Sequence, residues 1–130
     1  ELYLIRHTSV DVPAGYSYGQ TDVPLRDSFE TEAETVKKGL QLISADKVYT
    51  SPLSRCVRLA SYCGFEDAWK DDRIKELNFG SWEMKSWDEV IVTRIPKDGL
   101  KIGYMFQLPE VNLLQINTTG SQLFLMKLEK

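Results

Sequence analysis

One stretch constrains the fold more than any other, the run LYLIRHT at residues 2–8. Its four consecutive apolar residues, two of them β-prone, predict a short strand that is buried on both faces. Strands of that kind belong to parallel α/β sheets, where ligands bind beyond the carboxyl ends of the strands. Arg6 and His7, the only histidine of the sequence, stand at that end. The run therefore predicts an α/β fold whose first strand ends at an anion site suited to phosphoryl transfer.

Length and charge limit the class of protein. A chain of 130 residues has room for one domain with one core. The net charge of −3 argues against nucleic acid or an anionic membrane as a partner, because both need a basic excess. No apolar run approaches the roughly 20 residues of a membrane span, and the N-terminus lacks the pattern of a signal peptide. We expect a cytoplasmic protein that binds a small molecule; its oligomeric state stays open, a homodimer included.

The two cysteines predict no cross-link. Cys56 and Cys63 fall in one predicted helix, about 10 Å apart along its axis, which is too far for a disulfide. Both are expected to be small core residues in a reducing compartment. With one histidine and no close pair of cysteines, the chain offers only scattered carboxylates to a metal, so neither a metal nor another cofactor is expected.

A long polar connection and a helix follow the first strand. The connection, residues 9–28, leaves directly from His7, which favours a functional loop over a disordered one. The helix after it is expected to be capped by Asp27 or Ser28, with Asp27 and Glu30 in the arrangement of a capping box. Its core-facing stripe consists of Phe29, Ala33, Val36, Leu40 and Ile43.

A second strand and helix repeat this order. Residues 47–50 predict the strand, and Ser51 and Pro52 are expected to open a helix that closes at Gly64. The apolar stripe of this helix consists of Leu53, Cys56, Val57, Ala60 and Cys63. Arg55 lies off the stripe and leans back toward the helix start, where free N–H groups favour an anion. If the two strands are parallel, Arg55 and His7 share one edge of the sheet.

The rest of the chain is less regular. Residues 74–83 suggest an ordered surface loop, and residues 86–89 a short helix. The apolar run at residues 90–93 predicts a further buried strand. The C-terminus is expected to form a hairpin with strands at residues 111–117 and 122–129.

These residue types are sufficient for phosphoryl transfer. Neutral imidazole attacks phosphorus, arginine forks bind the equatorial oxygens, and a carboxylic acid protonates the leaving oxygen. Against that, a lone histidine at a strand end is more often structural than catalytic. An arginine such as Arg55 near a helix start is normally a surface residue. Composition and periodicity alone lead to an α/β domain with an anion site.

Three segments carry the interpretation further. They are LIRHT at residues 4–8, YTSPLSRC at residues 49–56 and ELNFGSWE at residues 76–83. In this order they resemble the motifs of the histidine phosphatase superfamily, the phosphoglycerate-mutase-like enzymes. Each motif alone is a weak signal, but the three together are a strong one. The resemblance implies an α/β fold of the phosphoglycerate-mutase-like type, with a mainly parallel sheet flanked by helices.

Within the superfamily, residues 12–25 are most similar to the α-ribazole phosphatases. These enzymes remove the phosphate of α-ribazole 5′-phosphate while the nucleotide loop of cobalamin is assembled, and they need no metal. The resemblance implies the nucleophile His7, the proton donor Glu76, the phosphate-binding residues Arg6 and Arg55, and the substrate-mouth residues Gln20 and Thr21.

Several alternatives stay open. The substrate could be another small sugar or nucleotide phosphate, turned over by a phosphatase or a mutase, and Glu83 is a rival for the role of acid. The superfamily also has a second catalytic histidine, which this sequence lacks. A non-catalytic phosphate-binding pseudophosphatase is therefore the alternative from another class. We expect instead one domain over residues 1–130 with segments missing near residues 89–90 and 93–94, because a parallel strand at residues 90–93 would lack a crossover of sufficient length.

Overall fold

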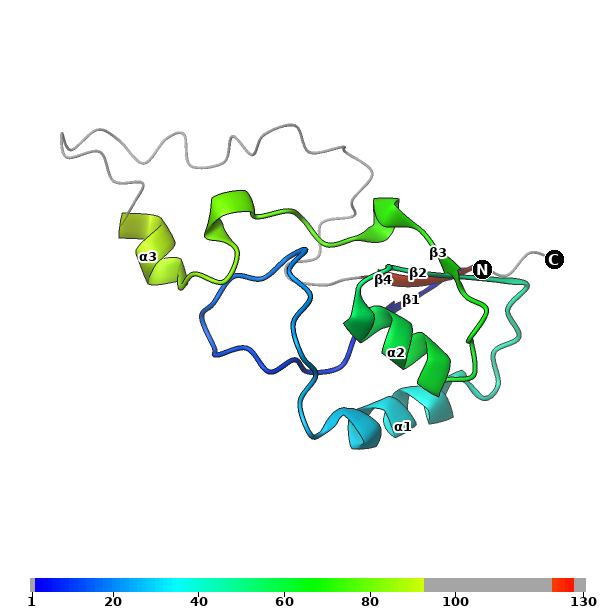
Figure 1. Cartoon of the computed structure of the whole chain (residues 1–130). Coiled ribbons are helices and arrows are strands. Elements are labelled where there is room, and N and C mark those ends of the chain that lie inside the picture. The colour runs from blue at the N-terminus through cyan, green and yellow to red at the C-terminus, as the bar shows by residue number, and fades with distance from the viewer. Residues whose placement is uncertain (1, 93–122, 128–130) are drawn as a thin grey trace.

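The computed structural model describes residues 2–92 and 123–127. This part of the chain has an α/β fold with one four-stranded sheet in the order β1-β4-β2-β3 (Figure 1). The strands are β1 Leu2–Arg6, β2 Lys47–Thr50, β3 Trp69–Lys70 and β4 Leu123–Lys127. Strand β4 is antiparallel to both β1 and β2, and β2 pairs in parallel with β3. The first three strands therefore run in one direction, and the predicted shared edge at the ends of β1 and β2 is confirmed.

Three α-helices and two short 3₁₀ segments accompany the sheet in the described part of the chain. They are α1 Phe29–Leu40, α2 Ser54–Tyr62, α3 Trp87–Val92, η1 Asp72–Ile74 and η2 Gly80–Trp82. Helices α1 and α2 lie on the same side of the sheet, whereas α3 lies apart from it, beyond the loop that follows β1 (Figure 1). None of the described helices is long and apolar enough to cross a membrane.

The core lies between the sheet and these two helices. Ala33 and Leu59 are buried together where α1 meets α2, and Ala60 packs against apolar residues of β1 and β2. Ala33 and Ala60 belong to the predicted apolar stripes, which thus face the core, whereas the buried Leu59 was not part of the predicted stripe of α2. Cys56 is buried in α2 and Cys63 half-buried at its end, and neither forms a disulfide, as predicted.

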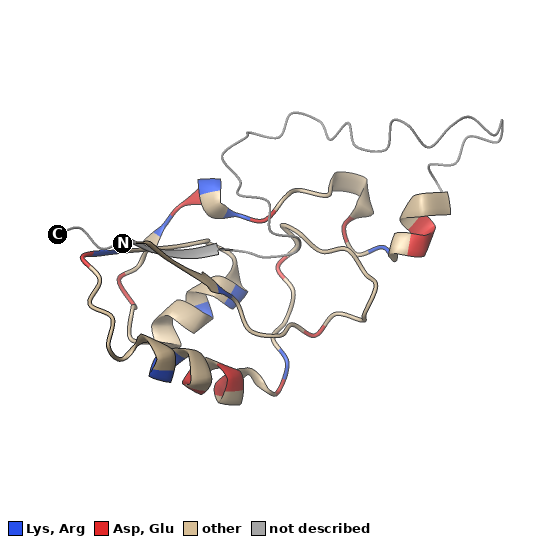
Figure 2. Ribbon diagram, turned by 180° about the vertical axis from the view of Figure 1, so that it is seen from behind, with Lys and Arg blue, Asp and Glu red and all other residues tan. Residues whose placement is uncertain are grey.

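Charged residues of both signs lie along α1 (Figure 2). Glu30 and Glu32 stand in the first turn, and Lys37 and Lys38 in the last, the order that the helix dipole favours. Lys38 forms an ion pair with Glu34 one turn earlier, at 3.8 Å. An exposed pair of this kind contributes only about 0.3–0.5 kcal/mol, so packing holds the helix.

Strand β1 is not buried on both faces, so that prediction is wrong. Tyr3 and Ile5 pack against the core beneath α2. Leu2 and Leu4 point the other way and are 52% and 45% exposed. The reason is that α1 and α2 cover only one face of the sheet.

The two predicted helix starts need correction. Ser28 precedes α1, but no side-chain cap forms; its hydroxyl donates instead to Glu32, at 2.6 Å. Helix α2 begins at Ser54 rather than at Pro52, because the backbone before it is still extended. Its end at Gly64 is confirmed: this glycine has a φ of +91°, which closes the helix at little steric cost.

Residues 90–92 belong to helix α3 and not to a strand, which contradicts the sequence-based prediction. Ser86 and Glu89 form a capping box: the Ser86 N–H donates to the Glu89 carboxylate at 3.0 Å, and the Glu89 N–H donates to Ser86 Oγ at 3.2 Å. This local pairing overrides the β-preference of the apolar run. The crossover argument for missing segments therefore no longer holds. Of the predicted hairpin, the second strand exists as β4, and residues 111–117 lie outside the described residues.

Two loops far apart in sequence lie side by side and support the site. The loop after β1 pairs with the segment before α3 through an isolated β-bridge between Tyr16 and Ser86. Ser17 N–H donates to the Lys85 carbonyl and accepts through its own carbonyl from Met84 N–H, both at 2.8 Å. These bonds hold the 15–21 loop and the 79–87 segment together.

Candidate active site

His7 follows β1 directly and is only 8% exposed. Its Nδ1 lies 2.6 Å from the carbonyl oxygen of Thr8, so that Nδ1–H donates and Nε2 carries the lone pair. Burial lowers the pKa of His7; the Thr8 bond opposes this, and the charges of Arg55 and Arg6 lower the pKa further. The imidazole therefore favours the neutral form more than a free histidine does.

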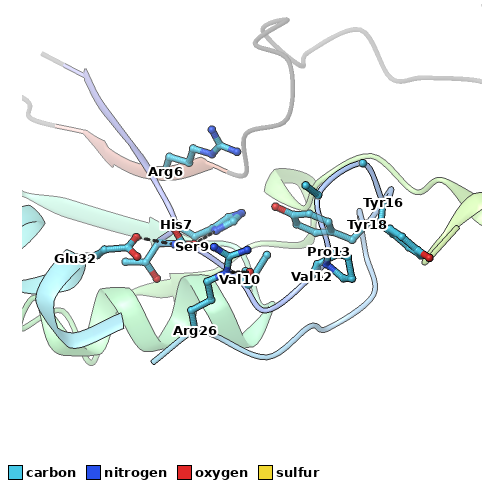
Figure 3. Close-up of a pocket in the computed structure, with 13 residues that line it drawn as sticks. Arg6, His7, Ser9, Val10, Val12, Pro13, Tyr16, Tyr18, Arg26 and Glu32 are labelled. Carbon is cyan, nitrogen blue, oxygen red and sulfur yellow. Dashed lines mark hydrogen bonds between the residues drawn. The ribbon is translucent and has the colours of Figure 1, made fainter. Parts of the chain in front are cut away.

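A cavity of about 380 Å³ opens beside His7 (Figure 3). Arg6 borders it from β1, Arg26 from the loop before α1, and Glu32 from α1 itself. The guanidinium of Arg26 is held by its Nε, which donates to the Val10 carbonyl at 2.9 Å. Two guanidinium groups against one carboxylate leave a positive excess next to the imidazole, which suits an anion.

Tyr18 links His7 to Arg55. Its ring centroid is 6.5 Å from that of His7, and the two rings are tilted by 59°. The guanidinium carbon of Arg55 lies 5.5 Å from the same Tyr18 ring, within cation–π range. The structure thus brings Arg55 toward His7, although Arg55 does not line the cavity itself.

Arg55 is fully buried, so the alternative of a surface arginine is wrong. It stands in the first turn of α2 and reaches the loop that follows β1. Nη1 donates to the Thr21 carbonyl at 2.9 Å, and Nη2 donates to the Gly19 carbonyl at 2.5 Å. Its Nε is buried with no hydrogen-bond partner among the described residues.

The two candidate acids differ in environment. Burial raises the pKa of Glu76, against a hydrogen bond from Leu77 N–H and the charges of Arg55 and Arg6, which lower it. Burial also acts to raise the pKa of Glu83, but hydrogen bonds led by those from Gly19 and Thr21 outweigh it and hold the pKa at about 2. Glu76 thus favours the protonated form more than a free glutamate does, and Glu83 stays ionised.

Gln20 and Thr21 contact the segment that carries both glutamates, Glu76 and Glu83. Neither residue lines the cavity beside His7. Gln20 Nε2 donates to the backbone carbonyl of Glu76 at 3.1 Å. Thr21 Oγ1 donates to the Glu83 carboxylate at 2.6 Å. Both residues therefore join the loop after β1 to the 76–83 segment.

Several residues of the site do not follow from the sequence reasoning. Tyr18, Arg26 and Glu32 border the cavity, and Glu83 binds the loop beside Arg55. Tyr18 and Arg26 carried a signal, since both lie in the long loop that leaves from His7, and Glu83 was predicted only as a rival acid. The role of Glu83 depends on contacts across more than sixty residues, which spacing does not indicate.

The model of one protein family matches residues 2–99, three quarters of the chain: the histidine phosphatase superfamily, branch 1. The chain belongs to this superfamily. Its α/β fold is of the phosphoglycerate-mutase-like type, as the motifs implied. The matched range contains each predicted site residue.

Several solved structures resemble this histidine phosphatase chain. YhfR of Bacillus stearothermophilus is 27% identical, with a TM-score of 0.58, over 65% of this chain and 44% of its own. TTHB049 of Thermus thermophilus is 25% identical, with a TM-score of 0.58, and the match covers 72% of this chain and 58% of TTHB049. A mycobacterial glucosyl-3-phosphoglycerate phosphatase is 23% identical, with a TM-score of 0.64, and the match covers 72% of this chain and 45% of that phosphatase. This similarity supports the fold alone.

The chain spans about half the length of these solved relatives. Among curated proteins, none matches it significantly. The family and the fold are therefore established, and activity and substrate follow as proposals.

Proposed function

We propose that this protein is a phosphomonoesterase that transfers the phosphoryl group of its substrate first to His7 and then to water. The observation that carries the proposal is the state of His7, a buried imidazole whose Nδ1–H is bound to the Thr8 carbonyl and whose pKa is lowered by burial. A neutral imidazole with its lone pair on Nε2 is the nucleophile that this chemistry needs. Arg6 borders the same cavity and supplies positive charge.

Arg6 and Arg55 are proposed to hold the phosphate. Arginine forks bind phosphate oxygens through paired, charge-assisted hydrogen bonds. Arg55 keeps one buried donor, Nε, without a partner among the described residues. A buried unsatisfied donor costs about 1–3 kcal/mol, and a phosphate oxygen would satisfy it. Because a point charge cannot replace the fork, Arg55→Lys should lose most activity.

Glu76 is proposed to be the general acid. In the first step the bond between His7 Nε2 and phosphorus forms, the bond from phosphorus to the leaving oxygen breaks, and the Glu76 proton passes to that oxygen. In the second step the Glu76 carboxylate takes a proton from the attacking water, the bond between the water oxygen and phosphorus forms, and the bond from phosphorus to His7 Nε2 breaks, which releases inorganic phosphate and the neutral imidazole. Its raised pKa supports this role, because an acid must be protonated to donate. The ionised Glu83 is unsuited to it.

The proposed substrate is α-ribazole 5′-phosphate. Support comes from the similarity of residues 12–25 to the α-ribazole phosphatases. It also comes from Tyr16 and Tyr18, which border the cavity beside its cationic groups and suit a phosphate that carries an aromatic nucleoside. Gln20 and Thr21 are proposed to border the substrate on the side of the acid.

Two other functions have a specific observation in their favour. The family match extends to the superfamily as a whole and not to one substrate, which keeps another small sugar or nucleotide phosphate as the second candidate substrate. The presence of only one histidine favours a phosphate-binding pseudophosphatase. We retain the proposal that segments are missing near residues 89–90 and 93–94, now supported by the absent second histidine and the length of the relatives rather than by a strand.

A substrate panel tests the proposed activity. Release of inorganic phosphate is measured from α-ribazole 5′-phosphate, a sugar phosphate and a nucleoside monophosphate, with His7→Ala as the control. We expect the highest kcat/KM for α-ribazole 5′-phosphate and no release by the variant. Faster turnover of the sugar phosphate would favour the second candidate. No release from any ester, together with measurable phosphate binding, would favour the pseudophosphatase.

A further inference from the structure

The carboxylate of Glu83 accepts five hydrogen bonds. Its Oε2 accepts from the backbone N–H of Gly19 at 3.0 Å and from both the N–H and the hydroxyl of Thr21, at 3.1 and 2.6 Å. Its Oε1 accepts from the N–H of Gln20 at 3.0 Å and of Phe79 at 3.1 Å. One carboxylate therefore binds three consecutive amides of the loop after β1 and also one amide of its own loop.

The opposite side of the same loop binds a cation. The carbonyls of Gly19 and Thr21 accept from the two terminal nitrogens of Arg55. Residues 19–21 thus lie between the Glu83 carboxylate and the Arg55 guanidinium, with N–H groups toward the anion and carbonyls toward the cation. The loop also reaches the acid-bearing segment, through the Gln20 side chain and the Glu76 carbonyl.

The two loops approach each other so closely at Gly19 that a side chain has no room there. A Cβ on Gly19 would lie 2.8 Å from Glu83 Oε1 and 2.8 Å from Phe79 Cδ2. Met84, directly after Glu83, has a φ of +60°, which few non-glycine residues adopt. Its N–H donates to the Ser17 carbonyl at 2.8 Å. Strained backbone persists only where the surroundings hold it, so the contact between the loops is tightly fixed.

We propose that Glu83 is a positioning residue: through the backbone of residues 19–21 it holds the guanidinium of Arg55 where the substrate phosphate binds. The inference rests on the proposed function, because it takes Arg55 as a phosphate ligand. Without the carboxylate, three consecutive amides lose their acceptor and the loop shifts. The two carbonyls shift with it, and Arg55 loses the contacts that orient its fork.

The first experiment follows the structure and not the activity. ¹⁵N NMR of the full chain measures hydrogen exchange at the amides of residues 19–21 and the Nε–H signal of Arg55. We expect Glu83→Gln to abolish slow exchange at these amides and to shift the Arg55 signal. Thr21→Val, which removes only the hydroxyl donor, should change both in the same direction but less, and serves if the first variant folds poorly. Glu66→Gln, at an exposed glutamate, is the matched control and should change neither.

The second experiment measures the affinity for inorganic phosphate in a double-mutant cycle. Glu83→Gln should weaken binding by about 10- to 100-fold, the effect seen when the supporting partner of a metal ligand is removed. In the Arg55→Lys background the same change should have no further effect, because Glu83 acts through Arg55.

The outcomes separate this inference from the function on which it rests. An unchanged Arg55 signal in Glu83→Gln overturns the positioning role whatever the affinities are. A changed signal with wild-type phosphate affinity, or additive losses in the cycle, also overturns it, since Glu83 is then merely structural. If the wild-type chain binds no phosphate, the proposed function fails instead. The NMR result then decides whether Glu83 orients Arg55 at all.

Discussion

Replacing Glu83 by glutamine should destabilise the protein at neutral pH, and the effect should fade in acid. The hydrogen bonds around the carboxylate lower its pKa from 4.5 to about 2 on folding. At 1.36 kcal/mol for each pKa unit, this shift corresponds to ~3 kcal/mol of stabilisation of the folded state. Because water still reaches part of the side chain, we expect ~2 kcal/mol. Glutamine loses this contribution, and its NH₂ group faces N–H donors.

The sign of the pH dependence follows from the direction of the shift. Since the pKa of Glu83 is lower in the folded state, its stabilisation is complete above pH 4.5 and is lost as the pH falls through about 2. The difference in unfolding free energy between wild type and Glu83→Gln should therefore be constant near neutrality. It should narrow steadily below pH 4.5.

Urea unfolding, followed by tryptophan fluorescence, measures this difference at pH 7 and in steps down to pH 3. Glu66→Gln is the control, because it removes the same charge from an exposed position. A typical domain has about 5–15 kcal/mol of stability, so the variant should remain folded at pH 7. Equal urea midpoints at pH 7, or a gap that does not narrow in acid, would refute the claim that these hydrogen bonds hold Glu83 ionised.

Three further predictions concern other positions. Gly19→Ala should destabilise the protein by ~1–3 kcal/mol, because the added Cβ would overlap the neighbouring loop. Gly39→Ala, in α1, should stabilise it by up to ~1 kcal/mol, because a Cβ there meets nothing within 4 Å. Thermal unfolding should therefore show a lower melting temperature for the first variant and a higher one for the second. Glu76→Gln should raise the stability of the protein at pH 7, since a raised pKa means that folding penalises the charged carboxylate. The same variant should lose the turnover of esters with poor leaving groups. A variant that is less stable, or that keeps this turnover, contradicts the assignment of Glu76 as the acid. The intact mass of the purified protein should exceed that of the 130-residue sequence if segments are missing near residues 89–90 or 93–94, and a mass equal to it would favour the pseudophosphatase.

Local patterns in the sequence were sufficient for the elements that carry the site. Short runs of apolar and β-prone residues predicted β1 and β2, and apolar stripes at helical spacing predicted α1 and α2. A short helix was predicted at residues 86–89, but its continuation to Val92 was missed, although Ser86 and Glu89 have the spacing of a capping box. There the β-branched run was given more weight than the cap. The exposed side of β1 could not be predicted, because it depends on which faces of the sheet the helices cover.

The site itself depends on contacts distant in sequence. Two glutamates of one segment, Glu76 and Glu83, have the same chemistry in the sequence, and only their surroundings separate a candidate acid from a fixed carboxylate. The burial of Arg55 likewise requires the carbonyls of Gly19 and Thr21, which a local pattern does not place beside it. Sequence reasoning therefore identified the candidate residues, whereas the hydrogen bonds that fix them came from the fold.

The most direct test of the central claim is the detection of phosphohistidine. The full chain is mixed with a ³²P-labelled phosphomonoester and quenched within one turnover, and the labelled peptide is identified by mass spectrometry. We predict one phosphoryl group on the peptide that contains His7, stable in base and released by acid, and none in His7→Ala. Label on another residue, or normal turnover by His7→Ala, would contradict the claim that the imidazole at the end of β1 is the nucleophile.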